Sequence, residues 1–149
     1  DKLGLNHQAC RNCWITAMEA SLALGDLEEA DRVYGIAASL PDGHVYPFLR
    51  AQMRRFRAQL AAAREDPETA EAEFRAAAAS LGDLRCVFDR AVVQTEHLEW
   101  LDRRGRGADD DAVRLEAEAR GVFESLGATA WLERLDQATA TSGAAQPIG

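Results

Sequence analysis

The sequence has few cysteines, and their number is odd. Three cysteines occur in 149 residues, which does not fit the even, paired set of a small secreted disulfide framework. No apolar run reaches the roughly 20 residues of a membrane-spanning helix, and no secretory signal segment is present. We therefore expect a cytoplasmic chain, and because it begins at Asp1 rather than at a methionine, we expect it to be a piece of a larger protein.

The chain also has fewer basic residues than acidic ones. The chain carries 17 Lys and Arg against 25 Asp and Glu, a formal net charge of −8. Binding to nucleic acid or to anionic lipid usually depends on a basic surface. The overall charge therefore argues against both kinds of partner, although it leaves room for a local basic stripe.

Runs of β-branched residues are nearly absent. The commonest residues, among them Ala, Leu, Arg and Glu, mostly favour helices. A chain of this length fits one domain and buries roughly two-thirds of its unfolded surface. The composition thus predicts a helical domain that needs no disulfide bonds.

Apolar residues recur at helical spacing almost throughout and predict seven helices. Gly25 and Gly82 are expected to end helices, whereas Asp26, Asp66 and Asp83 are expected to cap them. The expected helices cover approximately 10–24, 27–37, 47–63, 67–81, 84–101, 112–126 and 129–138. Residues 139–149 are small and polar and are expected to form a flexible tail.

The second and fourth predicted helices repeat one another. Alanine, an aromatic residue and alanine recur at a fixed offset of 40: Ala30, Tyr34 and Ala37, then Ala70, Phe74 and Ala77. This pattern resembles the tetratricopeptide repeat. The third helix pair is expected to be looser. We predict an all-α, tetratricopeptide-like solenoid of antiparallel helix hairpins over 1–138, the alternative being an unrelated helical bundle.

A second resemblance covers mainly residues 66–135. The matching positions are Arg120, Phe123, Leu126, Gly127, Ala128, Trp131 and Arg134. This segment resembles the C-terminal tetratricopeptide region of large bacterial signalling ATPases, which are often joined to class III adenylate or guanylate cyclase domains or to LuxR-like DNA-binding domains. The resemblance implies a regulatory role. The phosphate-binding loop of such ATPases is absent from the sequence, so neither activity is carried over to this chain.

An arginine stripe is the main candidate for partner binding. Arg50, Arg54 and Arg57 follow i, i+4 and i+7 on the third predicted helix, with Arg64 further along the same face. Aligned guanidinium groups can clamp carboxylates or a phosphate. The competing interpretation is a solvated face whose charge is balanced by nearby acids.

Two further candidates are weaker. Trp100 falls slightly off the apolar stripe of its helix and is a candidate anchor for a partner, with packing between repeats as the alternative. His7, Cys10 and Cys13 have donor types that suit zinc. Three donors fall short of the usual four, however, and the alternative is that both cysteines are small core residues.

These observations favour a non-catalytic interaction or sensor module of a larger signalling protein, without a cofactor. The expected partner is a protein, a peptide or a neighbouring domain of the same protein, and self-association as a homodimer is a further expectation. The alternatives are a small-molecule-sensing domain with a pocket between helices and a zinc- or thiol-responsive module.

Overall fold

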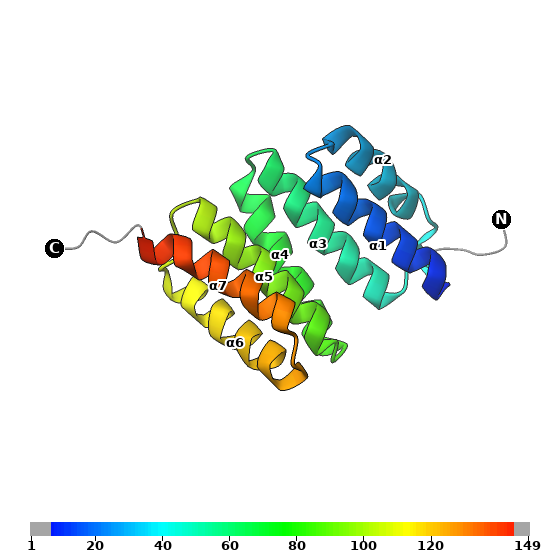
Figure 1. Ribbon diagram of the computed structural model, residues 1–149. Helices are drawn as coiled ribbons and strands as arrows, with labels where there is room; N and C mark the ends of the chain where they lie inside the picture. Colours follow the sequence, from blue (N-terminus) through cyan, green and yellow to red (C-terminus); the bar gives the residue numbers. More distant parts are fainter. Residues whose placement is uncertain (1–6, 145–149) are drawn as a thin grey trace. The chain divides into compact units, whose positions relative to one another are not determined.

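The computed structural model describes residues 7–144, and within them it contains helices and no strands (Figure 1). The helices are α1 (Gln8–Ala23), α2 (Leu27–Ala38), α3 (Pro47–Ala63), α4 (Pro67–Asp83), α5 (Val87–Arg103), α6 (Asp110–Leu126) and α7 (Thr129–Ala144), with a short 3-10 helix η1 (Asp42–His44). The prediction of an all-α fold built from helical hairpins is confirmed.

The chain divides into two compact units, Asp1–Ser80 and Leu81–Gly149, where we expected one domain. The boundary falls within α4. We expected a flexible tail over residues 139–149, but α7 continues to Ala144. Residues 145–149 of that predicted tail lie outside the described part of the chain.

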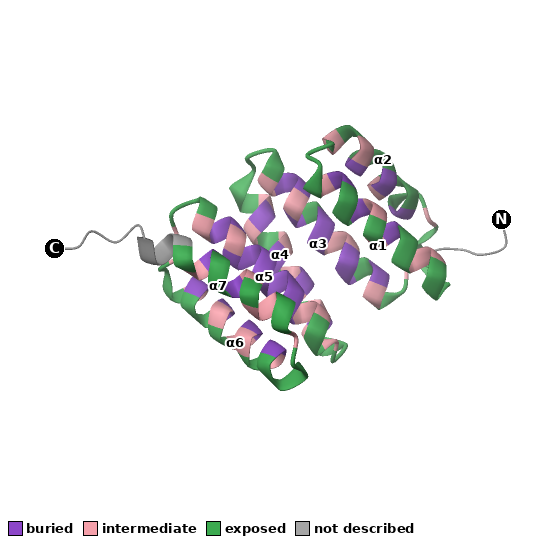
Figure 2. Ribbon diagram, in the orientation of Figure 1, coloured by how far each residue is buried: buried purple, intermediate pink, exposed green. Residues whose placement is uncertain are grey.

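In the first unit, α1 and α2 form a hairpin and α3 packs against both (Figures 1 and 2). The Trp14 ring meets Phe56 edge to face at 5.4 Å between ring centres, and its indole N–H donates to the Val33 carbonyl at 2.7 Å. The core comprises Trp14, Met18, Ala30, Val33, Ala37, Leu49, Phe56 and Leu60. Burial of these apolar side chains is the main source of stability in this unit.

In the second unit, α5 contacts both α6 and α7. Three aromatic rings meet there: Phe123 stacks on Trp131 with ring centres 5.4 Å apart, and Phe88 lies 6.0 Å from each of them in an edge-to-face arrangement. Buried aliphatic residues on α6 and α7 accompany these rings: Ala112, Leu115, Ala119 and Leu135.

Five of the turns between helices share one backbone geometry. Each contains a residue with a φ between 57° and 73°: Gly25, Glu65, Arg85, Gly105 and Gly127. The next residue then donates its N–H to the carbonyl five positions back, for example Asp26 to Ser21 at 2.9 Å and Asp66 to Ala61 at 2.9 Å. This is the Schellman arrangement, which satisfies carbonyls that a helix end leaves open.

Small residues recur at buried positions of α2, α4 and α6, each of which is the second helix of a hairpin. Ala30, Ala70 and Ala112 are fully buried, as are Ala37, Ala77 and Ala119. The offset is 40 residues between the first two hairpins and 42 to the third. The third hairpin therefore keeps the pattern more closely than the sequence prediction allowed, because its longer loop only shifts the register.

Several predicted boundaries are borne out and others are wrong. Asp26 and Asp66 do cap α2 and α4, accepting from the backbone N–H groups three residues on at 3.1 and 3.2 Å. Gly82 does not end α4, which continues to Asp83. Leu24 and Leu84, which fall at the ends of two predicted helix ranges, lie beyond the observed helix ends and are exposed.

Candidate functional site

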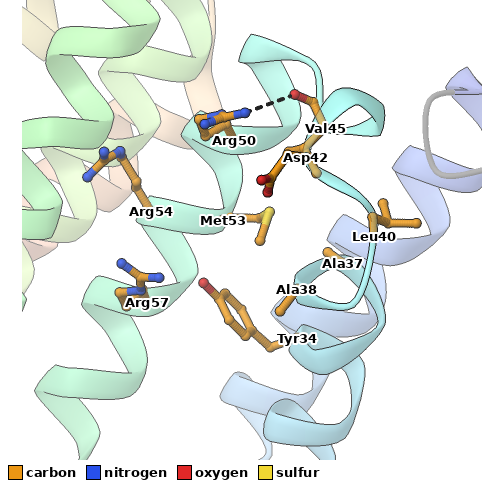
Figure 3. A pocket seen from close by; sticks show the side chains of 10 residues that line it. All are labelled: Tyr34, Ala37, Ala38, Leu40, Asp42, Val45, Arg50, Met53, Arg54 and Arg57. Atoms are coloured by element: carbon orange, nitrogen blue, oxygen red, sulfur yellow. Dashed lines mark hydrogen bonds between the residues drawn. The ribbon is translucent and has the colours of Figure 1, made fainter.

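A pocket of about 240 Å³ lies in the first unit between α2, the connection 39–46 and α3 (Figure 3). Its lining residues are Tyr34, Ala37, Ala38, Leu40, Asp42, Val45, Arg50, Met53, Arg54 and Arg57. Pockets for drug-sized ligands usually measure about 300–1,000 Å³. This pocket therefore has room for a single side chain or a ligand of similar size.

Helix α3 supplies the charged wall of the pocket. It begins at Pro47, whose fixed φ suits the first turn of a helix. Arg50, Arg54 and Arg57 then fall on one face because residues three and four apart are neighbours on a helix. The structure thus brings all three predicted arginines to one pocket. Arg64, the fourth member of the stripe, is not among the lining residues and pairs with Asp31.

Glu73 of α4 pairs with two of these arginines. Its Oε2 lies 3.4 Å from Nη1 of Arg54, and its Oε1 lies 3.4 Å from Nη1 of Arg57. Strong guanidinium–carboxylate bonds are shorter, at about 2.7–2.9 Å. The Glu73 side chain is 15% exposed, against 41% for Arg54 and 55% for Arg57. One shielded carboxylate is thus shared, at long range, by two more exposed cations.

Tyr34 of α2 faces Arg57 across the pocket (Figure 3). The pKa of the Arg57 guanidinium is raised above its ordinary value, chiefly by its charge interaction with Tyr34 and further by Glu73, although partial burial acts in the opposite direction. Tyr34 and Glu73 therefore both favour the charged form of Arg57.

Arg50 stands apart from this network. Its guanidinium donates to the Val45 carbonyl at 3.4 Å, which is long for such a bond. Among residues 7–140, no carboxylate lies within 4.0 Å of the Arg50 guanidinium. The carboxylate of Asp42 also lines the pocket and has no ion-pair partner in that part of the chain (Figure 3).

Trp100, the other predicted partner-binding residue, lies in the interior. It is 3% exposed. Its ring is tilted against His97 with centres 5.8 Å apart, and the Arg104 guanidinium lies 5.4 Å from the ring centre. The structure therefore gives Trp100 the packing role that was the alternative, since a buried ring offers a partner no surface.

The weak metal candidate is not assembled. Within the described residues, no group of three or more His, Cys, Asp or Glu side chains is placed to hold a metal ion. His7 and Cys13 are exposed and Cys10 is half-buried. The alternative of two core cysteines is also wrong for Cys13, which points away from the core.

The residues of the second family resemblance have structural roles. Phe123 and Trp131 stack on one another, and Gly127 takes the left-handed position in the turn between α6 and α7. Arg134 covers the Trp131 ring at 4.9 Å and binds both carboxylate oxygens of Glu99, at 2.7 and 3.0 Å. This motif joins α6 and α7 to α5.

Sequence reasoning missed four residues of the site. Tyr34 appears in the sequence pattern only as a member of the repeat, and nothing in the pattern points to Asp42 or Met53 as part of a site. Glu73 was not singled out, because only the packing of α4 against α3 brings it to Arg54 and Arg57. The competing interpretation of the stripe expected nearby acids to balance its charge, but the sequence did not show which acid would do so.

Comparisons with protein-family models, curated proteins and solved structures give no match for this chain. Among the described helices, none combines the length and the apolar character needed to cross a membrane. The chemistry of the pocket between α2 and α3 is therefore the observation that bears most directly on function.

Proposed function

We propose that this chain is a non-catalytic binding module that recognises an acidic segment of a protein partner through the arginine face of α3. The observation that carries the proposal is the convergence of Arg50, Arg54 and Arg57 on one pocket with an apolar floor. Guanidinium groups form paired hydrogen bonds with carboxylates, and such bonds are stronger than those between neutral groups.

The floor of the pocket complements this charge. Met53, Val45 and Leu40 offer apolar surface beside the arginines. An acidic side chain has a short aliphatic stem, which can contact this surface while its carboxylate reaches a guanidinium. Stacked helical hairpins commonly bind partners through extended surfaces of this kind.

The context we propose is a larger cytoplasmic signalling protein. The support is the resemblance of residues 119–134 to the repeat arrays of signalling ATPases linked to nucleotide cyclase or LuxR-like domains. In such a protein the partner can be a neighbouring domain of the same chain. Sequencing the complete gene product tests this context, and a product that lacks any signalling domain would contradict it.

Neutralising the arginine face tests the binding function. The variant R50Q/R54Q/R57Q is compared with R32Q/R75Q/R114Q, which removes three exposed arginines from other surfaces. The probe is a labelled peptide of alternating leucine and glutamate, with glutamine in place of glutamate as the negative peptide. Fluorescence anisotropy is expected to show at least about tenfold weaker binding for the first variant only. Equal binding by both folded variants would refute the proposal.

A small-molecule-sensing role is the second candidate, and the pocket itself favours it. A volume of about 240 Å³ suits a small ligand as well as one side chain. The two roles differ in what saturates the site. A free carboxylate that binds more tightly than the acidic peptide and displaces it would favour sensing.

A further inference from the structure

We infer that the pocket between α2 and α3 is a monoanion site, in which Arg50 receives the carboxylate of the ligand and Glu73 acts as an internal counter-ion for Arg54 and Arg57. This inference rests on the proposed binding function and specifies its chemistry. The ligand class is a short aliphatic monocarboxylate, supplied either as a free molecule or as an acidic side chain of a partner.

The charges around the pocket set the valence of the ligand. Arg50, Arg54 and Arg57 contribute three positive charges, and Asp42 and Glu73 contribute two negative ones, so the balance is 3 − 2 = +1. One negative charge on the ligand neutralises the site. A dianion would leave an excess negative charge in a half-buried place, where charge is costly.

The hydrogen bonds indicate which arginine is open to the ligand. Arg54 and Arg57 share the two oxygens of Glu73, whereas Arg50 has only the long bond to the Val45 carbonyl. A carboxylate from the ligand can replace that neutral acceptor with a shorter, charge-assisted bond. To bind at Arg54 or Arg57 instead, it would have to compete with Glu73.

The apolar lining selects the body of the ligand. Ala37, Leu40, Val45 and Met53 line the pocket beside the arginines. Figure 3 shows Met53 at the centre of this group, with Arg50 and Asp42 at one end and Tyr34 and Arg57 at the other. A branched aliphatic chain of a few carbons can cover Met53 while its carboxylate meets Arg50.

Glu73 then determines specificity without contacting the ligand. Replacing Glu73 by glutamine frees two guanidinium groups three residues apart on one face of α3 and raises the net charge of the site to +2. The pocket of such a variant should hold a second anionic group. Glu73→Gln is therefore expected to strengthen binding of monoanions and to admit dianions.

The experiment uses the full chain and four probes: 4-methylpentanoate, its uncharged amide, the dianion glutarate, and an N-acetylated, C-amidated Leu-Glu-Leu peptide. Binding is followed by the ¹⁵N–¹H NMR signals of the arginine side chains. In the unaltered protein, 4-methylpentanoate should bind at least about tenfold more tightly than its amide, because the amide lacks the charge. The Arg50 signal should move most.

Two variants test the inference, and each is compared with a matched control. R50Q should weaken binding of 4-methylpentanoate about tenfold or more, whereas R32Q, on the exposed face of α2, should not change it. E73Q should raise the affinity for glutarate relative to 4-methylpentanoate by about tenfold, whereas E29Q, which also removes a carboxylate from an arginine pair, should leave the ratio unchanged. Circular dichroism checks that each variant is folded.

The single variant R54Q provides a charge-matched test that does not depend on how E73Q folds. It lowers the net charge of the site by one, as R50Q does, but it keeps Arg50, so it should weaken 4-methylpentanoate binding at least about threefold less than R50Q does, a difference of about 0.7 kcal/mol. Equal losses of binding in R54Q and R50Q, unchanged binding in R50Q, or an unchanged glutarate ratio in E73Q would each overturn the inference.

The outcomes separate this inference from the proposed function. If the alternating leucine and glutamate peptide binds through the arginine face but E73Q does not change the anion preference, the inference fails and the binding function stands. If 4-methylpentanoate binds at Arg50 and no acidic peptide does, the monoanion site stands and the protein-binding function fails. Tighter binding of the tripeptide than of the free acid indicates a partner side chain as the source.

Discussion

At the residue scale, Trp14 ties together three helices of the first unit. It lies on α1, donates its indole N–H to the Val33 carbonyl on α2, and meets the Phe56 ring on α3. Only 4% of the residue is exposed. A buried tryptophan normally finds a hydrogen-bond acceptor, since leaving its N–H without one is costly.

Substitutions at Trp14 separate its packing from its hydrogen bond. Trp14→Phe keeps an aromatic ring but loses the N–H, and we expect the free energy of unfolding to fall by about 1–2 kcal/mol. Trp14→Ala also opens a cavity and should cost about 3–5 kcal/mol. Urea denaturation followed by circular dichroism measures both values. Equal losses for the two variants would show that the ring packing contributes little.

Single residues also show how far the sequence predicts the candidate site. The arginine stripe was predictable, because helical spacing alone places Arg50, Arg54 and Arg57 together. Glu73 and Tyr34 could not be assigned to the site, since their roles depend on how α2 and α4 are rotated against α3. Trp100 shows the reverse problem: its position off the apolar stripe suggested exposure, but α5 is buried over most of its circumference between Ala91 and Leu101.

At the element scale, the turns have more regular geometry than their sequences suggest. Glycine takes the left-handed position in three of the five similar turns, and Glu65 and Arg85 take it in the other two, each with a φ of 57°. A residue with a side chain pays about 1–2 kcal/mol in this conformation. The prediction that Gly82 ends the helix was therefore wrong. The turn forms instead where the backbone N–H of Cys86 donates to the Leu81 carbonyl, at 2.9 Å.

This strain can be measured at Arg85. Arg85→Gly removes both the side chain and the left-handed strain, whereas Arg85→Ala removes only the side chain. We expect the glycine variant to be about 1 kcal/mol more stable than the alanine variant. Thermal unfolding of the two proteins provides the comparison. If the alanine variant were equally stable, the turn would not hold a left-handed residue at this position.

At the scale of the whole molecule, the boundary between the two units lies inside a helix. Residues 80 and 81 belong to different units, yet α4 runs through them from Pro67 to Asp83. Domain boundaries more often fall in exposed linkers. No pattern in the sequence indicates this division, because the spacing of apolar residues continues across positions 80 and 81 without a break.

A proline at the boundary tests whether α4 is continuous. Ser80→Pro removes a backbone donor and introduces a clash within the helix, so we expect a loss of about 3 kcal/mol in the free energy of unfolding. Ser80→Ala is the control and should be neutral or slightly stabilising, since alanine favours helices. Chemical denaturation measures both. A proline variant as stable as the control would mean that the helix is interrupted at the boundary in solution.

The matching turns at Glu65 and Gly105 have a consequence for how such a chain can change in length. The two residues are 40 positions apart, share a positive φ, and each is followed by a donor to the carbonyl five positions back. A cassette cut at these two points has interchangeable ends. Duplicating or deleting residues 66–105 would therefore place the same type of backbone turn at the new junction.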